Sequence, residues 1–189
     1  QSRFMKKCVV IGVTGGIAVY KALDIISALK KKDIDVRVIM TESATKFVNP
    51  ITFQSLSNNA VAVDTFQEIK VHEIQHISLA QRADLMLIAP ATANIIGKVA
   101  NGIADDMLST TIMACKSKVI FAPAMNTNMY ENRIVQDNIE KLKGYGYGFI
   151  EPGSGRLACG DIGVGKLADV SDIVAVSYTH LRAHETKAN

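Results

Sequence analysis

Four short, mainly apolar runs, each followed by small or polar residues and then a helical stretch, constrain the fold of this chain most. Runs of this length and apolarity are typical of strands that are buried on both faces. Their alternation with helices predicts an α/β fold, a doubly wound parallel sheet with helices on both sides. The four strands are predicted at 7–13, 34–40, 84–89 and 118–122, with weaker ones at 61–64 and 147–150.

The loops that follow these strands are the predicted ligand site, because doubly wound sheets bind ligands beyond the carboxyl ends of their strands. Gly12–Gly16 (G-V-T-G-G) lies between a strand and a helix, where backbone amides and the helix N-terminus can hold a phosphate. It matches neither G-x-G-x-x-G nor the P-loop, and the second strand ends at Thr41 rather than at a ribose-binding acid. The loops favour a mononucleotide such as FMN over NAD, but a glycine turn made for close packing fits the same residues.

The charge, the cysteine content and the lengths of the apolar runs argue against several classes of protein. The 189 residues suggest one domain, and a net charge of +3 with no basic run longer than Lys30–Lys32 gives no sign of nucleic-acid binding. Three cysteines without a C-x-x-C spacing indicate a reducing compartment, with neither disulfides nor a metal site. No apolar run reaches the roughly 18 residues of a membrane span, and no signal peptide precedes the first strand. We therefore expect a cytoplasmic protein that does not bind membranes.

Both ends of the chain look foreign to the domain. Met5 is the expected natural start, and the sequence from about Ser177 onward has no clear hydrophobic period. We expect a folded domain at 1–176 and a tail at 177–189 that is disordered or not native. His180 and His184 lie in this tail and receive no role.

The stretch 153–166 (G-S-G-R-L-A-C-G-D-I-G-V-G-K) is predicted to be a mobile flap over the site. Eight of the thirteen glycines lie between Gly144 and Gly165, and such segments have little side chain to bury. Cys159, in the middle of the flap, could act as an acid, a nucleophile or a redox partner. A solvent loop with an incidental cysteine is the alternative. Cys8 and Cys115 are interpreted as packing residues.

Other polar residues allow a functional and a structural interpretation. The segment 72–76 (H-E-I-Q-H) matches the zinc protease signature H-E-x-x-H, but no third ligand follows at a suitable distance, so we interpret the match as chance. His76 alone could act as a base or could simply begin a helix. Asn126 could bind a carboxylate or cap a helix, and Asn94 has the same ambiguity.

Five segments, taken together and in this order, resemble the homo-oligomeric flavin-containing cysteine decarboxylases. The resemblance extends over about residues 5–176 and implies a Rossmann-like flavoprotein fold of three layers. The segments are G-V-T-G-G-I-A-V-Y-K at 12–21, H-I-S-L-A-Q-R-A-D at 76–84, A-P-A-T-A-N at 89–94, P-A-M-N-T-N-M-Y at 123–130 and G-R-L-A-C-G-D-I-G-V-G-K at 155–166.

The resemblance implies a role for each matching residue. FMN would be bound between the subunits of a homotrimer, with trimers possibly gathered into a dodecamer. His76 would be the active-site base, Cys159 the proton donor and Asn126 the group that binds the substrate carboxylate. Further substrate contacts would come from Met125, Arg156 and Ala158. Residues implied at the cofactor are Gly15, Gly16, Ile17, Thr41, Ser43, Thr92, Ala93, Asn94, Ile95 and Ala124.

The implied activity is FMN-dependent decarboxylation of 4′-phosphopantothenoylcysteine to 4′-phosphopantetheine in coenzyme A biosynthesis. Transient oxidation of the substrate thiol would produce a C=S group that accepts electrons when CO2 leaves, and re-reduction with protonation by Cys159 would complete the reaction. Two alternatives stay open at this point. One is decarboxylation of the C-terminal cysteine of a peptide, and the other is a non-catalytic flavin-binding regulatory subunit that binds a partner protein.

Overall fold

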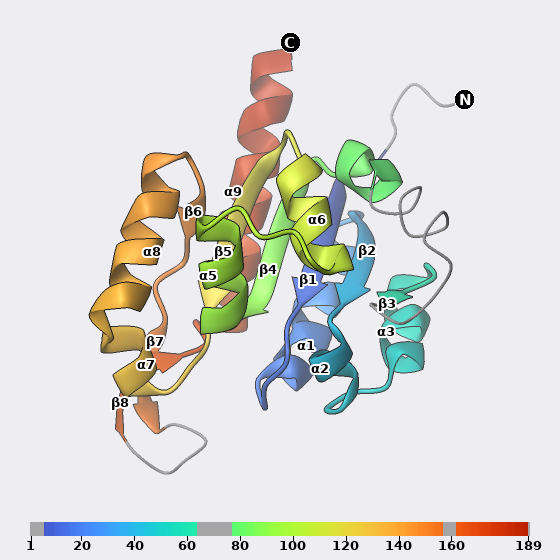
Figure 1. The fold of residues 1–189 in the computed structure, drawn as a ribbon. Coiled ribbons are helices and arrows are strands. Elements are labelled where there is room, and N and C mark those ends of the chain that lie inside the picture. The colour runs from blue at the N-terminus through green and yellow to red at the C-terminus, as the bar shows by residue number, and fades with distance from the viewer. Residues whose placement is uncertain (1–5, 64–76, 157–161, 189) are drawn as a thin grey trace.

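A six-stranded parallel sheet forms the centre of the molecule in a computed structural model that describes residues 6–63, 77–156 and 162–188 (Figure 1). The strand order is β3-β2-β1-β4-β5-β6, so the direction of chain progression reverses between β1 and β4. This arrangement confirms the predicted doubly wound α/β fold. The strands are β1 (Cys8–Val13), β2 (Asp35–Met40), β3 (Ala62–Val63), β4 (Leu85–Ala91), β5 (Lys118–Pro123) and β6 (Gly148–Phe149).

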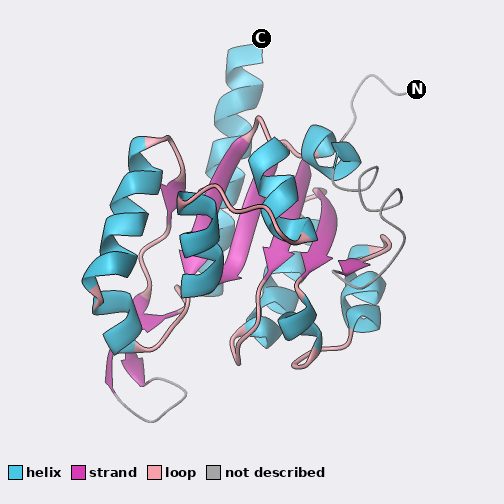
Figure 2. Ribbon diagram, in the orientation of Figure 1, coloured by secondary structure: helices cyan, strands magenta, loops and turns pink. Residues whose placement is uncertain are grey.

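Helices cover both faces of this sheet (Figure 2). One face packs against α1 (Val19–Lys31), α3 (Pro50–Ser57) and α9 (Val170–Ala188). The other face packs against α5 (Ala93–Ala100), α6 (Met107–Ala114) and α8 (Arg133–Gly144). The remaining helical pieces are α2 (Glu42–Thr45), α7 (Thr127–Glu131) and the segment 77–82.

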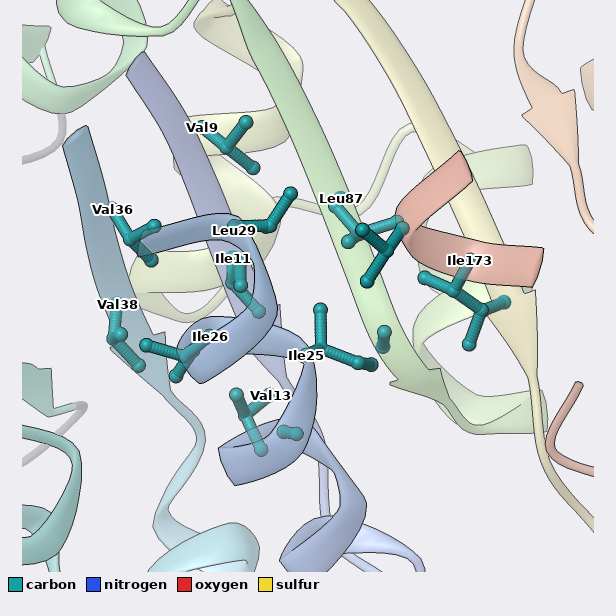
Figure 3. Packing of buried hydrophobic residues seen from close by; sticks show 14 of the residues in the cluster. Val9, Ile11, Val13, Ile25, Ile26, Leu29, Val36, Val38, Leu87 and Ile173 are labelled. Atoms are coloured by element: carbon teal, nitrogen blue, oxygen red, sulfur yellow. The ribbon is translucent and has the colours of Figure 1, made fainter. Parts of the chain in front are cut away.

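Two apolar clusters, one on each face, hold the layers together. Successive strand side chains point to opposite faces, so Ile11 of β1 belongs to the α1 cluster and its neighbour Val10 to the α5 cluster. Figure 3 shows Ile25 of α1 and Ile173 of α9 against the strands, close to Leu87 of β4. All six residues of β1 are buried, which explains why that run is almost continuously apolar.

The sequence predicts a single helix at about 128–143, but this segment forms two helices, α7 and α8. The break comes at Asn132, whose backbone is extended (φ −58°, ψ 130°) and whose side chain accepts a hydrogen bond from Ile134 N at 2.9 Å. A residue in this conformation ends α7 and caps α8, because its oxygen replaces a partner that the first turn lacks. The sequence also predicts a helical turn at 52–56. The helix found there, α3, begins earlier, at Pro50, after a second asparagine cap at Asn49.

The sequence predicts a closing helix at 169–176, with the tail after it. The helix, α9, instead continues to Ala188. Ser177 is buried and donates a hydrogen bond to Ile173 O at 2.8 Å, and Leu181 is also buried in the α1 cluster. The segment after Val176 therefore has a helical period, but its buried stripe is narrow, with Ile173, Ser177 and Leu181 at spacings of four residues. The foreign origin of 177–189 stays a prediction.

The glycine-rich stretch contains a two-stranded antiparallel hairpin, β7 (Gly153–Arg156) and β8 (Ile162–Lys166), which the sequence did not indicate. The residues between the strands, 157–161, lie outside the part that the structure describes. The predicted mobility of the flap therefore stays a prediction. None of the described helices is long and apolar enough to span a bilayer.

Candidate active site

The loops after β1 and β4 meet at the point where the strand order reverses. Thr14, which is buried, donates from its hydroxyl to Pro90 O at 2.6 Å and accepts from Thr92 N at 3.1 Å. A third bond joins Thr14 N to Pro90 O at 3.3 Å. One side chain thus fixes the relative positions of the two loops that border the predicted site.

Gly15 lets a third loop approach the first two. A Cβ placed on Gly15 would lie 2.6 Å from Ser43 Cβ and 3.1 Å from the Ser43 carbonyl carbon. No side chain fits there unless α2 moves away. Because Thr41 N also donates to Val13 O at 3.0 Å, the ends of β1 and β2 form one continuous rim.

A polar cavity of about 430 Å³ lies along this rim. Its walls come from the loops after β1, β2 and β4 and from the start of α5. The hydroxyl and amide groups that line it belong to Thr14, Thr41, Ser43, Thr92 and Asn94. Hydroxyls, amides and helix N-termini are the groups that bind phosphate and polyol oxygens in proteins.

A second, more apolar cavity of about 650 Å³ shares Gly15 and Thr92 with the polar one. The two cavities are therefore adjacent, at the carboxyl ends of β1 and β4. The apolar side chains that line the second cavity are Ile17, Tyr20, Ala124, Met125, Met129 and Leu167. This pair can take an elongated ligand with a polar end and a flat apolar end.

Two threonines on the rim act as helix caps. Thr41 accepts from Ala44 N at 3.2 Å, and Thr92 accepts from Ile95 N at 3.3 Å. A hydroxyl that accepts a helix N–H can still donate its own proton, so Thr92 can contact a ligand while it caps α5. The Thr41 hydroxyl already donates to Val13 O at 3.5 Å, which ties the cap of α2 to the end of β1. The cap of α5 is Thr92 and not Asn94, which lies two residues later in the first turn of the helix and is exposed at the cavity.

Asn126 is a helix cap, which is one of the two interpretations that the sequence leaves open, and carboxylate binding stays a prediction. Its Oδ1 accepts from Asn128 N at 2.8 Å and caps α7, and the residue also lines the apolar cavity. Next to it, Met125 N donates to Gly165 O at 2.8 Å. Gly165 has φ +128°, and a Cβ there would collide with the Met125 carbonyl oxygen, so a glycine is required. The base of the hairpin is thereby anchored beside Asn126.

Charge is concentrated at one wall of the polar cavity. Lys98 Nζ lies 2.8 Å from Asp105 Oδ1 and 3.1 Å from Asp106 Oδ2. Burial disfavours the Lys98 charge, but hydrogen bonds to the two carboxylates outweigh that cost and raise its pKa. Burial likewise disfavours the Asp106 carboxylate, and bonds from Ser109 and Lys98 more than compensate, so its pKa is lowered.

The structure brings all ten residues that the resemblance implies at the cofactor to these two cavities. Gly15, Thr41, Ser43, Thr92, Asn94 and Ile95 line the polar one. Gly16, Ile17, Ala93 and Ala124 line the apolar one, together with the implied substrate residues Met125 and Asn126. Arg156 is described only through its place in β7, and His76, Ala158 and Cys159 lie outside the described residues, as does the segment 72–76.

Sequence reasoning missed Lys98, Glu42, Asp105 and Asp106 at the polar cavity and Lys166 at the apolar one. Lys98 had a usable signal, because it follows Asn94 by four residues and so lies on the same helical face. The two aspartates follow an interrupted helix, and nothing local indicates that they fold back toward α5.

The two described cysteines are confirmed as packing residues. Cys8 is fully buried in β1, and burial raises the pKa of its thiol to about 12, which keeps it protonated. Cys115 is half-buried at the end of α6, and burial raises the pKa of its thiol as well. Neither lines a cavity of the site.

The comparisons with known proteins agree with this geometry. The flavoprotein family model matches residues 2–182. The coenzyme A biosynthesis bifunctional protein CoaBC of Bacillus subtilis is 52% identical over 180 residues, which are 95% of this chain but only 44% of that protein. The probable phosphopantothenoylcysteine decarboxylase of Streptococcus mutans is 46% identical, over 90% of this chain and 96% of its own.

Solved structures show the same fold. A PPC decarboxylase mutant in complex with pantothenoylaminoethenethiol superposes with a TM-score of 0.79 at 28% identity, over 93% of this chain and 98% of that one. The FMN-dependent cysteine decarboxylase SpaF superposes with a TM-score of 0.77 at 27% identity. The chain therefore belongs to the flavoprotein family, which confirms the resemblance to flavin-containing cysteine decarboxylases that its motifs indicate.

Proposed function

We propose that this chain is an FMN-dependent decarboxylase that converts 4′-phosphopantothenoylcysteine to 4′-phosphopantetheine. The observation that carries the proposal is the pair of adjacent cavities at the carboxyl ends of β1 and β4, one polar and one apolar. The proposed substrate rests on two relatives. One, at 46% identity, is named a probable phosphopantothenoylcysteine decarboxylase, and the other, at 52% identity, is named a bifunctional protein of coenzyme A biosynthesis.

The groups at the two cavities fit FMN. The hydroxyls of Ser43 and Thr92, with the amides at the start of α5, suit the ribityl chain and its phosphate. Ile17, Ala124 and Met125 offer apolar surface for the ring. When bound, flavin supplies the reversible oxidation of the substrate thiol that makes loss of CO2 feasible.

The residues of the chain bind and protonate the substrate in this proposal. Asn126 donates its side-chain amide to the substrate carboxylate while its oxygen caps α7. His76 acts as the base for the oxidation, and Cys159, between β7 and β8, returns the last proton. Arg156 and Ala158 contact the substrate from the hairpin, whose base is anchored beside Asn126.

The proposed assembly is a homotrimer, with a dodecamer as the larger form, in the cytoplasm. Three side chains around the apolar cavity support a partner subunit there, since Ile17, Tyr20 and Met129 are 61%, 53% and 49% exposed. Apolar groups that border a ligand cavity and stay this exposed are typical of protein interfaces. Light scattering of the purified protein measures the assembly directly.

The decisive experiment combines a spectrum with an assay. We expect the purified protein to be yellow, with flavin absorption bands, and to release CO2 from 4′-phosphopantothenoylcysteine but not from a peptide that ends in cysteine. The reverse preference would favour the peptide substrate, and flavin without turnover would favour a regulatory subunit. A colourless protein that FMN does not reconstitute would contradict the proposal.

A Cys159→Ser variant tests the proposed proton donor. We expect it to release CO2 and then stop, with an enethiol product and reduced flavin, because a serine hydroxyl is a much weaker acid than a thiol. Product analysis by mass spectrometry, together with the flavin spectrum, detects this state. Complete turnover by the variant would exclude Cys159 from the role.

A further inference from the structure

We propose that Lys98 is the cation that recognises the phosphate of FMN, and that Asp105 weakens this recognition by sharing the charge of Lys98. The inference rests on the proposed function, since it assumes that the polar cavity receives the phosphate end of the cofactor. It goes further by assigning opposite effects to two residues: Lys98 strengthens the preference for FMN over a flavin without phosphate, and Asp105 weakens that preference.

The position of Lys98 in α5 directs its ammonium toward the polar cavity. Lys98 follows Asn94 by four residues, so the two lie on one face of the helix, and both line the cavity. Helical side chains lean toward the N-terminus, which brings Nζ closer to the end of α5 where the caps and free amides lie. Only 18% of the Lys98 side chain is exposed, so water and salt screen its charge less than that of a surface lysine.

Lys98 is the one positively charged group among the described residues that line this cavity. Three carboxylates, those of Glu42, Asp105 and Asp106, line it as well. If Lys98 were neutral, a phosphate dianion would meet three carboxylates with no cation beside it. Because carboxylate partners raise its pKa, Lys98 keeps its proton through the neutral range.

Asp105 and Asp106 have different structural roles. Asp106 accepts from Ser109 N at 2.7 Å and caps α6, so it belongs to the architecture of the loop as well as to the ion pair. Asp105 is 60% exposed and pairs with Lys98 at 2.8 Å. Replacing Asp105 therefore changes the charge at the cavity while it leaves the cap of α6 intact.

The test compares FMN with riboflavin, which lacks the phosphate, by fluorescence titration of protein stripped of flavin. In Lys98→Met, which keeps the length of the side chain, we expect FMN to bind about 10- to 100-fold more weakly, as for a lost bond to a charged group. Riboflavin affinity should stay within about twofold of the original. In Asp105→Asn we expect FMN to bind about two- to fivefold more tightly, with riboflavin again unchanged.

Two controls separate a phosphate contact from a general effect. Lys143→Met removes a cation from an exposed pair with Glu140, and Lys143 lines neither cavity. This variant should leave the affinities for FMN and for riboflavin unchanged. Lys98→Arg should retain most of the preference for FMN. Thermal unfolding and circular dichroism of each variant verify the fold.

Each outcome has a definite meaning. Equal losses of FMN and riboflavin affinity in Lys98→Met would show that Lys98 only supports the wall, and unchanged FMN affinity would show that it does not meet the phosphate; either result overturns the inference alone. Weaker FMN binding in Asp105→Asn would overturn the role of that residue. An unaltered protein that binds neither flavin would instead overturn the proposed function.

Discussion

The two ends of the central sheet are both rich in polar side chains, yet they differ in what those side chains contact. At the amino end, Asp35 binds Arg82 at 3.3 Å and Asn59 at 3.0 Å, and Asp84 accepts from Cys8 N at 2.7 Å. Every one of these groups is paired with another part of the chain. The result is a closed network that joins the starts of the strands.

At the carboxyl end, the polar groups border space instead. Thr41, Thr92 and Asn126 each use one oxygen to cap a helix and face a cavity as well. Since both ends have similar residue types, polarity alone does not mark a site. What marks it is that the polar groups of the carboxyl end line two adjacent cavities large enough for a ligand.

The largest expected effect tests the carboxyl end. Asn126→Asp keeps the size and the capping oxygen but replaces an amide donor with a carboxylate. Because Asp caps helices as well as Asn does, the melting temperature should change by less than about 2 °C. The substrate carboxylate would lose a hydrogen bond and meet a like charge, so kcat/KM should fall by at least about 100-fold. An active variant would mean that Asn126 is only a cap.

The next effect concerns the close approach at Gly15. In Gly15→Ala the new methyl group would meet Ser43 Cβ at 2.6 Å and push α2 away. We expect the free energy of unfolding to fall by about 1–3 kcal/mol and FMN affinity to fall with it. Denaturant titration and flavin titration measure the two quantities.

Gly97→Ala is the matched control for that variant. Gly97 lies within α5, and its nearest neighbour would be Asn138 Nδ2 at an ordinary 3.7 Å. Since alanine favours a helix over glycine, this variant should be as stable as the parent or more stable by up to about 1 kcal/mol. If both variants behave alike, the packing argument for Gly15 fails.

A smaller effect tests whether the amino end is purely structural. Asp35→Asn removes the anion that Arg37 and Arg82 share, in a side chain that is only 18% exposed. Stability should fall by about 1–2 kcal/mol, while flavin affinity and turnover per folded molecule stay the same. The exposed pair of Glu140 with Lys143 offers the control, because Glu140→Gln should cost less than about 0.5 kcal/mol. A loss of flavin affinity in Asp35→Asn would contradict the comparison.

The smallest effect is a dependence of stability on pH that both ends share. Burial disfavours the Asp35 carboxylate, but the bond from Asn59 and the charge of Arg37 outweigh it, so its pKa lies below the ordinary value, as that of Asp106 does. A lowered folded pKa means that the stabilisation is present above the unfolded pKa of about 3.9 and is lost as the pH falls through the folded pKa. Melting curves between pH 6 and 3 should show the loss only below about pH 4, and it should be smaller in Asp35→Asn.

Much of the fold could be predicted because the strands are buried on both faces. The apolar runs at 7–13 and 84–89 match β1 and β4 to within two residues. The helix boundaries that the sequence did not predict depend on single residues and on contacts with distant parts of the chain. The break at Asn132 requires one residue in an extended conformation, and α9 beyond Val176 is held by a narrow stripe that includes Ser177 and Leu181.

The candidate site could be predicted in its loops but not in its charges. Glycines, threonines and asparagines directly after strands are visible in the sequence, and the topology brings them together. Lys98, Asp105 and Asp106 lie in and after a helix, and a lysine there is usually a solvated surface residue. Their pairing at a cavity wall depends on how the segment after α5 folds back.

The sequence by itself determined that this chain builds a doubly wound sheet and where along the chain its loops of small polar residues fall, because burial on two faces and helix capping are local demands on residue type. Only the tertiary structure decided which polar groups satisfy one another and which face a cavity. That distinction depends on distances between residues far apart in the chain, such as Gly15 and Ser43 or Met125 and Gly165, which no local pattern encodes.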